Sequence, residues 1–503
     1  MKHINHRLNV FLQKLPLPSH WKLWFILALL FKSIIFIYKI TEPRTAQPYY
    51  SGTFACHSYD SSSYIDPIEN LLAEGVYEDD YRMPGYGWVY FLLRLIFSQG
   101  NALSALVLLQ LLLSVISVYV LALLAHHVFK HICYFYLTFF LYLISSYVSL
   151  YDYVLLTESF CTSSIIFSVY FLITGYNEKG KLLISGSFLT WAIFLRPIVF
   201  PILLIFVVYV FITNRKDNPG LTYKWSRSFV FMIPFLIFDG MWLIRNYCKY
   251  EVIAPLTRSI YYSKIEQSFE APLFHFMNAF GGSIVHWEPG AEITFFVPLS
   301  TSIKKKIEVI LPSYIYTSKF NYDSLLIVKR EIRELRNDSI PEKEKKALTQ
   351  KVKLQLDSYT ASIRQEKPFL YYVSSRFKVF KRFFIHSGTY NLFIKASYEL
   401  GKAELVVKVF YSLFYLFVLV SGFAGNIWLF IKGFKNVTYQ LLMVTGLYFA
   451  LVFPFVFKLD EYRYFVVGYP FFILASVYTL INGYQFISKK IHNVSDINYT
   501  SHL

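Results

Sequence analysis

The chain has 503 residues, of which 55% are hydrophobic, 20% aromatic and 16% charged, and its mean hydropathy is +0.42. This composition excludes a soluble globular enzyme and is typical of a polytopic membrane protein. The formal net charge of +17 does not indicate nucleic acid as a partner. The basic residues cluster at the ends of apolar runs, where they set topology and meet anionic lipid head groups. We therefore predict an all-α polytopic membrane protein that contacts membrane lipids and no nucleic acid.

Apolar runs of spanning length recur along the chain, and we count about ten by the usual length criterion. They lie near residues 23–40, 103–125, 132–150, 159–175, 182–196, 197–213, 228–244, 404–431, 438–457 and 464–487. The positive-inside rule places the basic N-terminus and every second connection on the cytoplasmic side. The basic residues at 130, 179–181, 215–227, 432–435 and 489–490 all fall on that side. The acid-rich first connection then falls outside.

That first connection contains the run YDSSSYIDPIENLLAEGVYEDDYRMPGYG. Between residues 64 and 72 its apolar side chains recur at three- and four-residue intervals, which predicts a short helix with one apolar face on the bilayer. Asp60 precedes this helix and is placed to point at a substrate. After the break at Pro84-Gly85, the segment 86–97 is too short to cross a hydrocarbon core of about 30 Å. We predict that it is a juxtamembrane or re-entrant piece.

The connection from about 245 to 403 is the one large extramembrane region. The predicted organisation is a transmembrane module over 1–244 with a catalytic first outer loop (41–102), an extracytoplasmic loop domain over 245–403, and C-terminal transmembrane helices over 404–503. Residues 322–364 are typical of two charged helices separated at residues 337–339. Residues 369–384 alternate aromatic with basic side chains, which favours an interfacial helix on anionic lipid.

Ionisable residues at the ends of spans are costly unless they are paired, hydrated or used. The predicted topology places a set of them at one outer face: Asp60, Arg82, Glu158, Arg196, Arg245 and Arg463. A carboxylate near fixed cations suits displacement at a phosphate-bearing carbon, because it can accept the proton of an incoming hydroxyl. Guanidinium groups would hold the phosphate and stabilise its charge as it leaves. In a purely structural role the arginines would instead snorkel, cap helices or pair with acids.

The run DSSSYIDPIENLLAEGVY…RMPGYG resembles the first outer loop of GT-C superfamily glycosyltransferases, in particular bacterial family 39 type members that are protein-mannosyltransferase-like or aminoarabinose-transferase-like. The later pieces LLTES, LRP, IRNY and EYRYF are similar to recurring segments of that group, in the same order. The resemblance covers roughly residues 20–250 and 404–487. It implies a GT-C type fold with outer-face juxtamembrane helices and a mostly helical outer domain. It also implies an enzyme of the inner (plasma) membrane that acts on the extracytoplasmic side.

The implied reaction moves a hexosyl or pentosyl group, with inversion, from a polyprenyl-phosphate donor to a hydroxyl of a glycan, lipid or protein acceptor. On the family pattern Asp60 matches the catalytic aspartate, Arg82 matches a basic residue that approaches the donor phosphate, and Arg463 matches the arginine of the last outer segment. The other residues expected to bind substrate are Tyr64, Glu158, Arg196, Arg245 and Tyr464. A metal site built from paired acids would need a second acid directly after Asp60, but that residue is Ser61. We therefore predict transfer without a metal or cofactor.

Two other functions remain open from the sequence. A transporter or flippase of a lipid-linked or anionic substrate would use the arginines as a binding cluster without breaking a bond. Such a carrier is expected to place its charged site near the midplane on interrupted helices, whereas these charges gather at the ends of spans. A polymerase or ligase of lipid-linked polysaccharide would also carry a large outer loop late in the chain.

Overall fold

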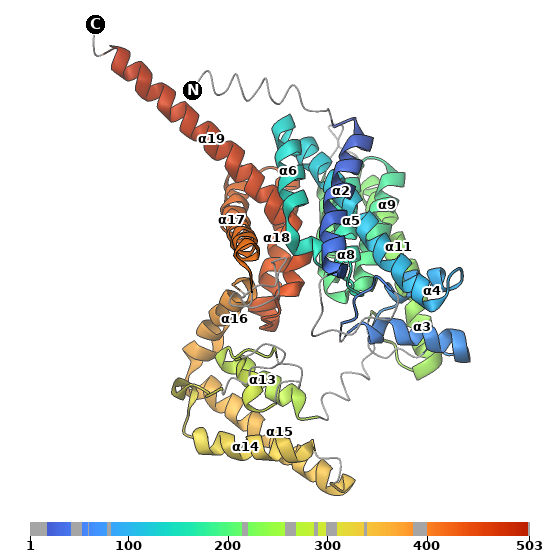
Figure 1. The fold of residues 1–503 in the computed structure, drawn as a ribbon, viewed down its shortest axis with the longest axis vertical. Helices are drawn as coiled ribbons and strands as arrows, with labels where there is room; N and C mark the ends of the chain where they lie inside the picture. Colours follow the sequence, from blue (N-terminus) through green and yellow to red (C-terminus); the bar gives the residue numbers. More distant parts are fainter. Residues whose placement is uncertain are drawn as a thin grey trace. The chain divides into compact units, whose positions relative to one another are not determined.

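The computed structural model describes residues 18–41, 53–58, 60–77, 82–213, 220–256, 268–285, 290–297, 309–336, 340–385 and 400–500, with side chains up to residue 488. Its helices are drawn in Figure 1. The chain divides into two units. The first unit is formed by Met1–Thr257, Gly388–Tyr448 and Phe465–Leu503, and the second by Arg258–Ser387 and Phe449–Tyr464.

The first unit contains the apolar helices and two short helices from the first connection. Its helices, in chain order, are α2 (Trp21–Thr41), α3 (Ser62–Glu74), α4 (Gly87–Arg94), α5 (Gln99–Phe129), α6 (Ile132–Ile144), α7 (Ser146–Ser149), α8 (Glu158–Thr174), α9 (Lys179–Leu195), η1 (Pro197–Val199), α10 (Phe200–Ile212), α11 (Leu221–Tyr250), α17 (Lys402–Lys432), α18 (Val437–Leu451, which ends in the second unit) and α19 (Tyr469–Thr500). The predicted apolar runs lie on these helices, except that 438–457 continues into η6 (Val452–Phe457) and 464–487 begins in η7 (Tyr462–Val467).

Six helices in the described ranges are long and apolar enough to cross a membrane. They are Trp21–Thr41, Gln99–Phe129, Leu221–Tyr250, Lys402–Lys432, Val437–Phe457 and Tyr469–Ser488. The other four predicted runs are helical but shorter, with 13 residues in α6 and α10 and 17 in α8 and α9. The described residues form no β-strand beyond isolated bridges. The predicted fold class, an all-α polytopic membrane protein, is confirmed, and the number of spans stays a prediction.

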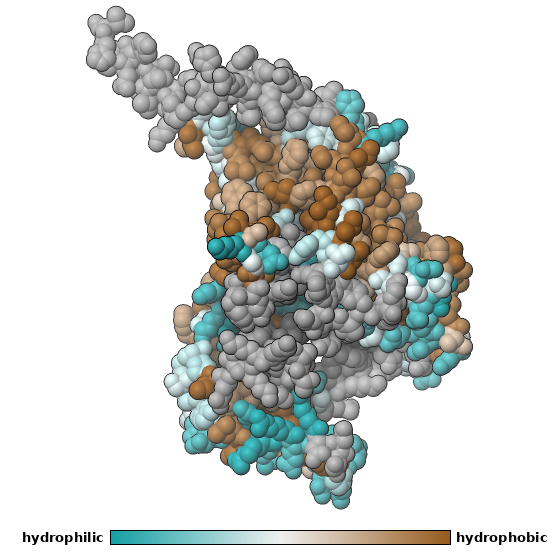
Figure 2. All heavy atoms as spheres, viewed as in Figure 1, coloured by the Kyte–Doolittle hydropathy of each residue, from teal (hydrophilic) through white to brown (hydrophobic). Residues whose placement is uncertain are grey.

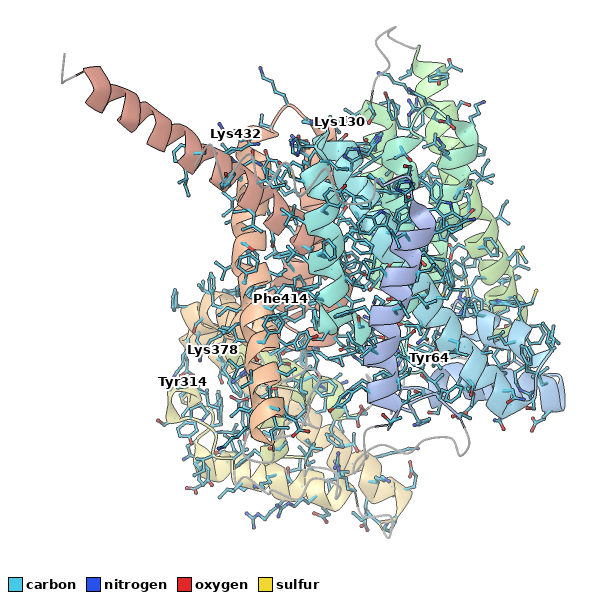
Figure 3. The ribbon with its side chains drawn as sticks, turned by 45° about the horizontal axis from the view of Figure 1, so that its top comes forward. Tyr64, Lys130, Tyr314, Lys378, Phe414 and Lys432 are labelled. Carbon is cyan, nitrogen blue, oxygen red and sulfur yellow. The ribbon has the colours of Figure 1, made fainter. Side chains whose placement is uncertain are left out.

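The surface of the first unit is apolar around its helices, as Figure 2 shows for one face. Lipid-length helices such as α2 and α17 keep large side chains exposed, among them Leu30, Ile34 and Val420. Lys130 and Lys432 lie at one end of this unit, whereas Tyr64 lies at the other end (Figure 3). The predicted topology requires this separation, because both lysines are expected on the cytoplasmic side and Tyr64 outside.

The second unit is built from α13 (Glu270–Phe280), η2 (Glu292–Phe295), η3 (Ser313–Ile315), α14 (Tyr322–Leu335), α15 (Glu342–Glu366), η4 (Leu370–Ser374), α16 (Ser375–Phe384) and η6 (Val452–Phe457). The segment η7 (Tyr462–Val467) crosses the boundary between the units. The two predicted charged helices are α14 and α15. Asn321 caps α14 by accepting from the Ser324 N–H at 3.0 Å.

A hydrophobic core holds the second unit together. Leu325, Val328 and Ile332 of α14 and Val352 and Leu356 of α15 are fully buried in it. The charged residues of the two helices occupy the remaining faces, as expected for amphipathic helices. Lys378 of α16 donates to the Tyr314 hydroxyl at 2.8 Å, a pair visible in Figure 3.

Candidate active site

The segment before α3 is fixed by pairing with a distant part of the chain. The Cys56 N–H donates to the Tyr153 carbonyl at 2.9 Å, and the Leu155 N–H donates to the Cys56 carbonyl at 3.0 Å. The buried Ser61 hydroxyl then donates to the Leu155 carbonyl at 2.9 Å. Asp60 therefore lies just before α3, on a stretch of backbone that residues 153–155 hold in place. The Cys56 thiol is buried, and the Cys248 thiol is exposed.

Asp60 forms an ion pair with Arg82, the pair that the resemblance selects. A terminal guanidinium nitrogen of Arg82 lies 3.0 Å from the Asp60 carboxylate, and the Arg82 Nε donates to the Ser63 hydroxyl at 3.0 Å. The guanidinium stands 4.8 Å from the Tyr64 ring centroid, a cation–π distance. The side chains of Asp60 and Arg82 remain 29% and 20% exposed. A ligand can therefore reach both groups.

A second ion pair joins Glu158, the first residue of α8, to Arg196, which follows α9. Arg196 donates to the Glu158 carboxylate through one nitrogen and to the Thr157 hydroxyl at 2.8 Å through Nε. Glu158 is fully buried. This ion pair links the end of α9 to the start of α8.

Tyr64 interacts electrostatically with both ion pairs. Burial raises the pKa of the Tyr64 hydroxyl above its ordinary value, and the nearby charges of Arg82 and Arg196 act against that rise. Glu158 and Asp60 act in the same direction as burial. Tyr64 is therefore within electrostatic reach of both pairs, and the structure brings five of the predicted site residues together around α3.

A close backbone approach at Gly85 sets where Arg82 lies. The Gly85 N–H donates to the Phe194 carbonyl at 3.2 Å, and the Trp191 indole donates to the Gly85 carbonyl at 3.0 Å. A Cβ at position 85 would lie 2.5 Å from the Phe194 carbonyl carbon, which no side chain tolerates. Glycine thus lets the Pro84-Gly85 turn contact the end of α9, two residues before Arg196.

An apolar cavity of about 490 Å³ begins one helical turn along α3 from Tyr64. Its lining comes from α3 and the turn after it (Ile68, Leu71, Gly75, Val76, Tyr77), from Pro84 and α4 (Trp88, Phe91), from Phe194 of α9, and from α11 (Phe238, Met241, Trp242, Arg245, Lys249). The apolar face of α3 was predicted to lie on the bilayer. Instead, Ile65 and Ile68 are buried within the unit, and Ile68 packs against Gly87 of α4.

Arg245 lines this cavity as one of two cations one helical turn apart. The guanidinium stands 4.6 Å from the Trp242 ring centroid and donates to the Tyr77 carbonyl at 3.3 Å. Lys249 donates to the same carbonyl at 2.9 Å. Sequence reasoning missed Lys249 and Trp242. Their spacing from Arg245 on α11, four and three residues, was the available signal, because such positions share a helix face.

Arg463 and Tyr464 belong to the second unit. Arg463 pairs with Glu461, and the Tyr464 ring stacks on Phe453 with centroids 4.5 Å apart. Their predicted part in the same substrate site stays a prediction. Within the described ranges no three His, Cys, Asp or Glu side chains are grouped to hold a metal ion. Metal independence also stays a prediction.

The fold and this site define a multi-pass, all-α membrane protein with an accessible acid–guanidinium pair beside an apolar cavity. No family model and no curated protein matches the chain. It is similar to the archaeal oligosaccharyltransferase AglB from Archaeoglobus fulgidus in complex with an inhibitory peptide and a dolichol-phosphate, with 12% identity and a TM-score of 0.44. It is also similar to the apo form of the oligosaccharyltransferase from that organism, with 13% identity and a TM-score of 0.46. Each match covers 94% of this chain and 52% of the other, so the chain spans about half the length of these structures.

Proposed function

We propose that this protein is a membrane glycosyltransferase that moves a sugar from a polyprenyl-phosphate-linked donor to an acceptor hydroxyl at the outer face of the membrane. The observation that carries the proposal is the Asp60–Arg82 pair, at 3.0 Å, which lies beside Tyr64, together with an apolar cavity that begins one helical turn along α3 from Tyr64. The pair supplies a base and a phosphate ligand, and the cavity supplies a place for a lipid chain. The proposal rests on the residues of this chain.

Asp60 is the general base in this proposal. The Asp60 carboxylate takes the proton of the acceptor hydroxyl as its oxygen bonds to the anomeric carbon, while the bond from that carbon to the phosphate oxygen breaks. The electron pair leaves on the lipid phosphate, and the anomeric configuration inverts. Exposure distinguishes the two acids as candidate bases. The Asp60 side chain is 29% exposed, whereas Glu158 is fully buried and paired with Arg196. An acceptor can therefore reach Asp60.

Arg82 holds the donor phosphate in this proposal. A guanidinium presents parallel N–H donors to phosphate oxygens, and its positive charge stabilises the charge that grows on the leaving group. The contacts of Arg82 with Asp60, Ser63 and the Tyr64 ring orient the group before substrate binds. Arg245 and Lys249 provide two further cations at the cavity lining.

The cavity takes the part of the isoprenoid chain next to the phosphate. Its lining is apolar except for Arg245 and Lys249, which suits contact with the apolar chain of a lipid. Lipid binding of this kind is not sensitive to the identity of the sugar. The sugar is therefore set by other residues, and a panel of donors is needed to find it.

The test is to incubate the purified full-length protein in lipid nanodiscs with a panel of polyprenyl-phosphate hexoses and pentoses. The expected result is release of polyprenyl phosphate from one donor, detected by mass spectrometry, and its loss in Asp60→Asn. Asp66→Asn is the matched control, because Asp66 is an exposed acid on the same helix. In proteoliposomes, movement of intact donor across the bilayer without release of lipid phosphate would contradict the proposal and support a flippase.

A further inference from the structure

Lys32 is an ammonium group buried in the middle of α2, a candidate membrane span. Its side chain is 0% exposed, and its Nζ donates to the Ser114 hydroxyl at 2.6 Å, the Ser149 hydroxyl at 2.9 Å and the Asp152 carboxylate at 3.2 Å. The other Asp152 oxygen accepts from the Ser159 hydroxyl at 2.6 Å. This network joins α2, α5, α7 and the start of α8 around one ion pair.

The segment that contains Asp152 is also the one that holds the candidate active site. Its residues 153–155 pair with Cys56 and Ser61, which lie on either side of Asp60 in the sequence. Its last residue, Thr157, accepts from Arg196. We refer to residues 151–157 as the support segment.

Gln110 of α5 also binds the support segment. Its side-chain amide donates to the carbonyls of residues 151, 152 and 154 at 3.3, 3.1 and 2.9 Å. Its carbonyl accepts from the Tyr86 hydroxyl at 2.7 Å, and the Tyr86 ring lies 5.2 Å from that of Tyr64. The support segment therefore contacts Cys56 and Ser61 on either side of Asp60 and contacts Arg196 through Thr157. Through Gln110 it is also linked to Tyr86, the aromatic neighbour of Tyr64.

A buried ion pair at membrane depth is expensive and is retained where it serves a site. Neither Lys32 nor Asp152 lines the apolar cavity, and the proposed chemistry does not use them. Each of its charged groups is hydrogen-bonded, and a network satisfied in this way rigidifies its surroundings. Rigidity of the support segment is thus what this pair supplies.

We propose that Lys32 and Asp152 are positioning residues, which fix the support segment and through it the placement of Asp60. The part that concerns catalysis rests on the proposed function. The claim that the pair fixes the support segment does not rest on the proposed function, because the accessibility of the Cys56 thiol measures it directly. Cys56 is 2% exposed and bonds to residues 153 and 155 through its backbone, so loosening of the support segment exposes its thiol.

The experiment measures the rate at which N-ethylmaleimide alkylates Cys56 in the full-length protein in nanodiscs, by peptide mass spectrometry. Exposed Cys248 reacts in every sample and serves as the internal reference. We expect Lys32→Met and Asp152→Asn each to raise the Cys56 rate at least about tenfold, because local opening becomes more populated when a buried partner is lost. If Lys32→Met does not accumulate, Asp152→Asn decides the result, since it keeps the size of the side chain.

Arg227→Met is the matched control. Arg227 is also a buried cation of the first unit, 1% exposed, but it donates to the carbonyls of Tyr176 and Thr213, beyond the opposite end of α8 from Glu158. We expect this variant to leave the Cys56 rate unchanged. Equal acceleration in Arg227→Met, or slow alkylation of Cys56 in both test variants, would overturn the positioning role.

Turnover gives a second, separable readout. If the protein transfers sugar, Lys32→Met and Asp152→Asn should lower kcat while the KM for donor stays within about twofold, because the lining of the cavity is intact. If no donor is turned over by the wild type, the proposed function fails, and the Cys56 rates still decide the positional claim. Unchanged kcat in a variant with accelerated Cys56 alkylation would overturn the link to catalysis.

Discussion

The guanidinium of Arg82 and the carboxylate of Asp60 are 3.0 Å apart, although the two residues are 22 positions apart in the sequence and the whole of α3 lies between them. Both side chains are partly exposed, so the pair is not sealed inside the unit. A phosphate that binds Arg82 therefore brings the donor carbon beside the acid. This arrangement makes separate predictions for the cation, the cavity and the acid.

Arg82→Ala should raise the KM for donor and lower kcat, with a combined loss of about 10- to 100-fold in kcat/KM. The reason is that a hydrogen bond to a charged group contributes about 1.5–3 kcal/mol. Arg82→Lys should lose less, since it keeps the charge without the planar donors. Steady-state kinetics on the active donor checks this, with Arg94→Ala as control because Arg94 pairs with Glu69 instead. Unchanged KM and kcat in Arg82→Ala would exclude the phosphate role.

Leu71→Trp should weaken donor binding, because Leu71 lines the cavity and an indole would occupy the space of the lipid chain. Leu72→Trp is the control, since Leu72 is the next residue, 39% exposed and outside the cavity lining. Competition by polyprenyl phosphate against a labelled donor in nanodiscs measures the difference. Equal inhibition constants in the two variants would show that the lipid binds elsewhere.

Glu158→Gln should destabilise the first unit strongly. It leaves the Arg196 guanidinium without its buried counter-charge, a change that costs about 3–5 kcal/mol in comparable pairs. Glu178→Gln breaks an exposed pair with Lys181 and should change the melting temperature little. Thermal unfolding in detergent compares the two variants. A Glu158→Gln protein as stable as Glu178→Gln would mean that the buried pair does not hold α8 to α9.

The contact between α3 and α4 should depend on pH through Glu69. Burial raises the pKa of Glu69, but hydrogen bonds from Arg94 and Tyr90 outweigh it and hold the pKa below its ordinary value. A lowered folded-state pKa adds stability above the unfolded value, about 4.3, and this stability is lost as pH falls through the folded value. Glu69→Gln should therefore melt lower than wild type at pH 7, with the difference shrinking below about pH 4. A difference independent of pH would contradict the ion pair.

Much of the fold could be predicted from the sequence, because apolar length and the placement of basic residues are local properties. The runs near 23–40 and 404–431 became α2 and α17, and the charged region at 322–364 became α14 and α15. The orientation of α3 could not be predicted in the same way. Its periodicity gave an apolar face, but whether that face met lipid or protein depended on α4, which packs on Ile68.

Some residues of the candidate site could likewise be predicted from local sequence, and others could not. Three of the site residues could be predicted because an ionisable group beside a turn or at the end of a span needs a partner or a function. They are Asp60, Arg82 and Arg196. Lys32 and Asp152 were missed, although a lysine inside the predicted span 23–40 was itself a signal that a partner must exist. The identity of that partner follows from the packing of α2 against residues 120 positions away, which no local pattern encodes.

The most direct measurement of the central claim determines donor binding and turnover separately in Asp60→Asn. Donor affinity is measured in nanodiscs with a labelled polyprenyl-phosphate sugar, and turnover is measured by release of lipid phosphate. Loss of the base should lower turnover by about 10²- to 10⁴-fold, while the dissociation constant changes less than about threefold, because Arg82 and the cavity remain. Turnover at the wild-type rate in Asp60→Asn would contradict the account.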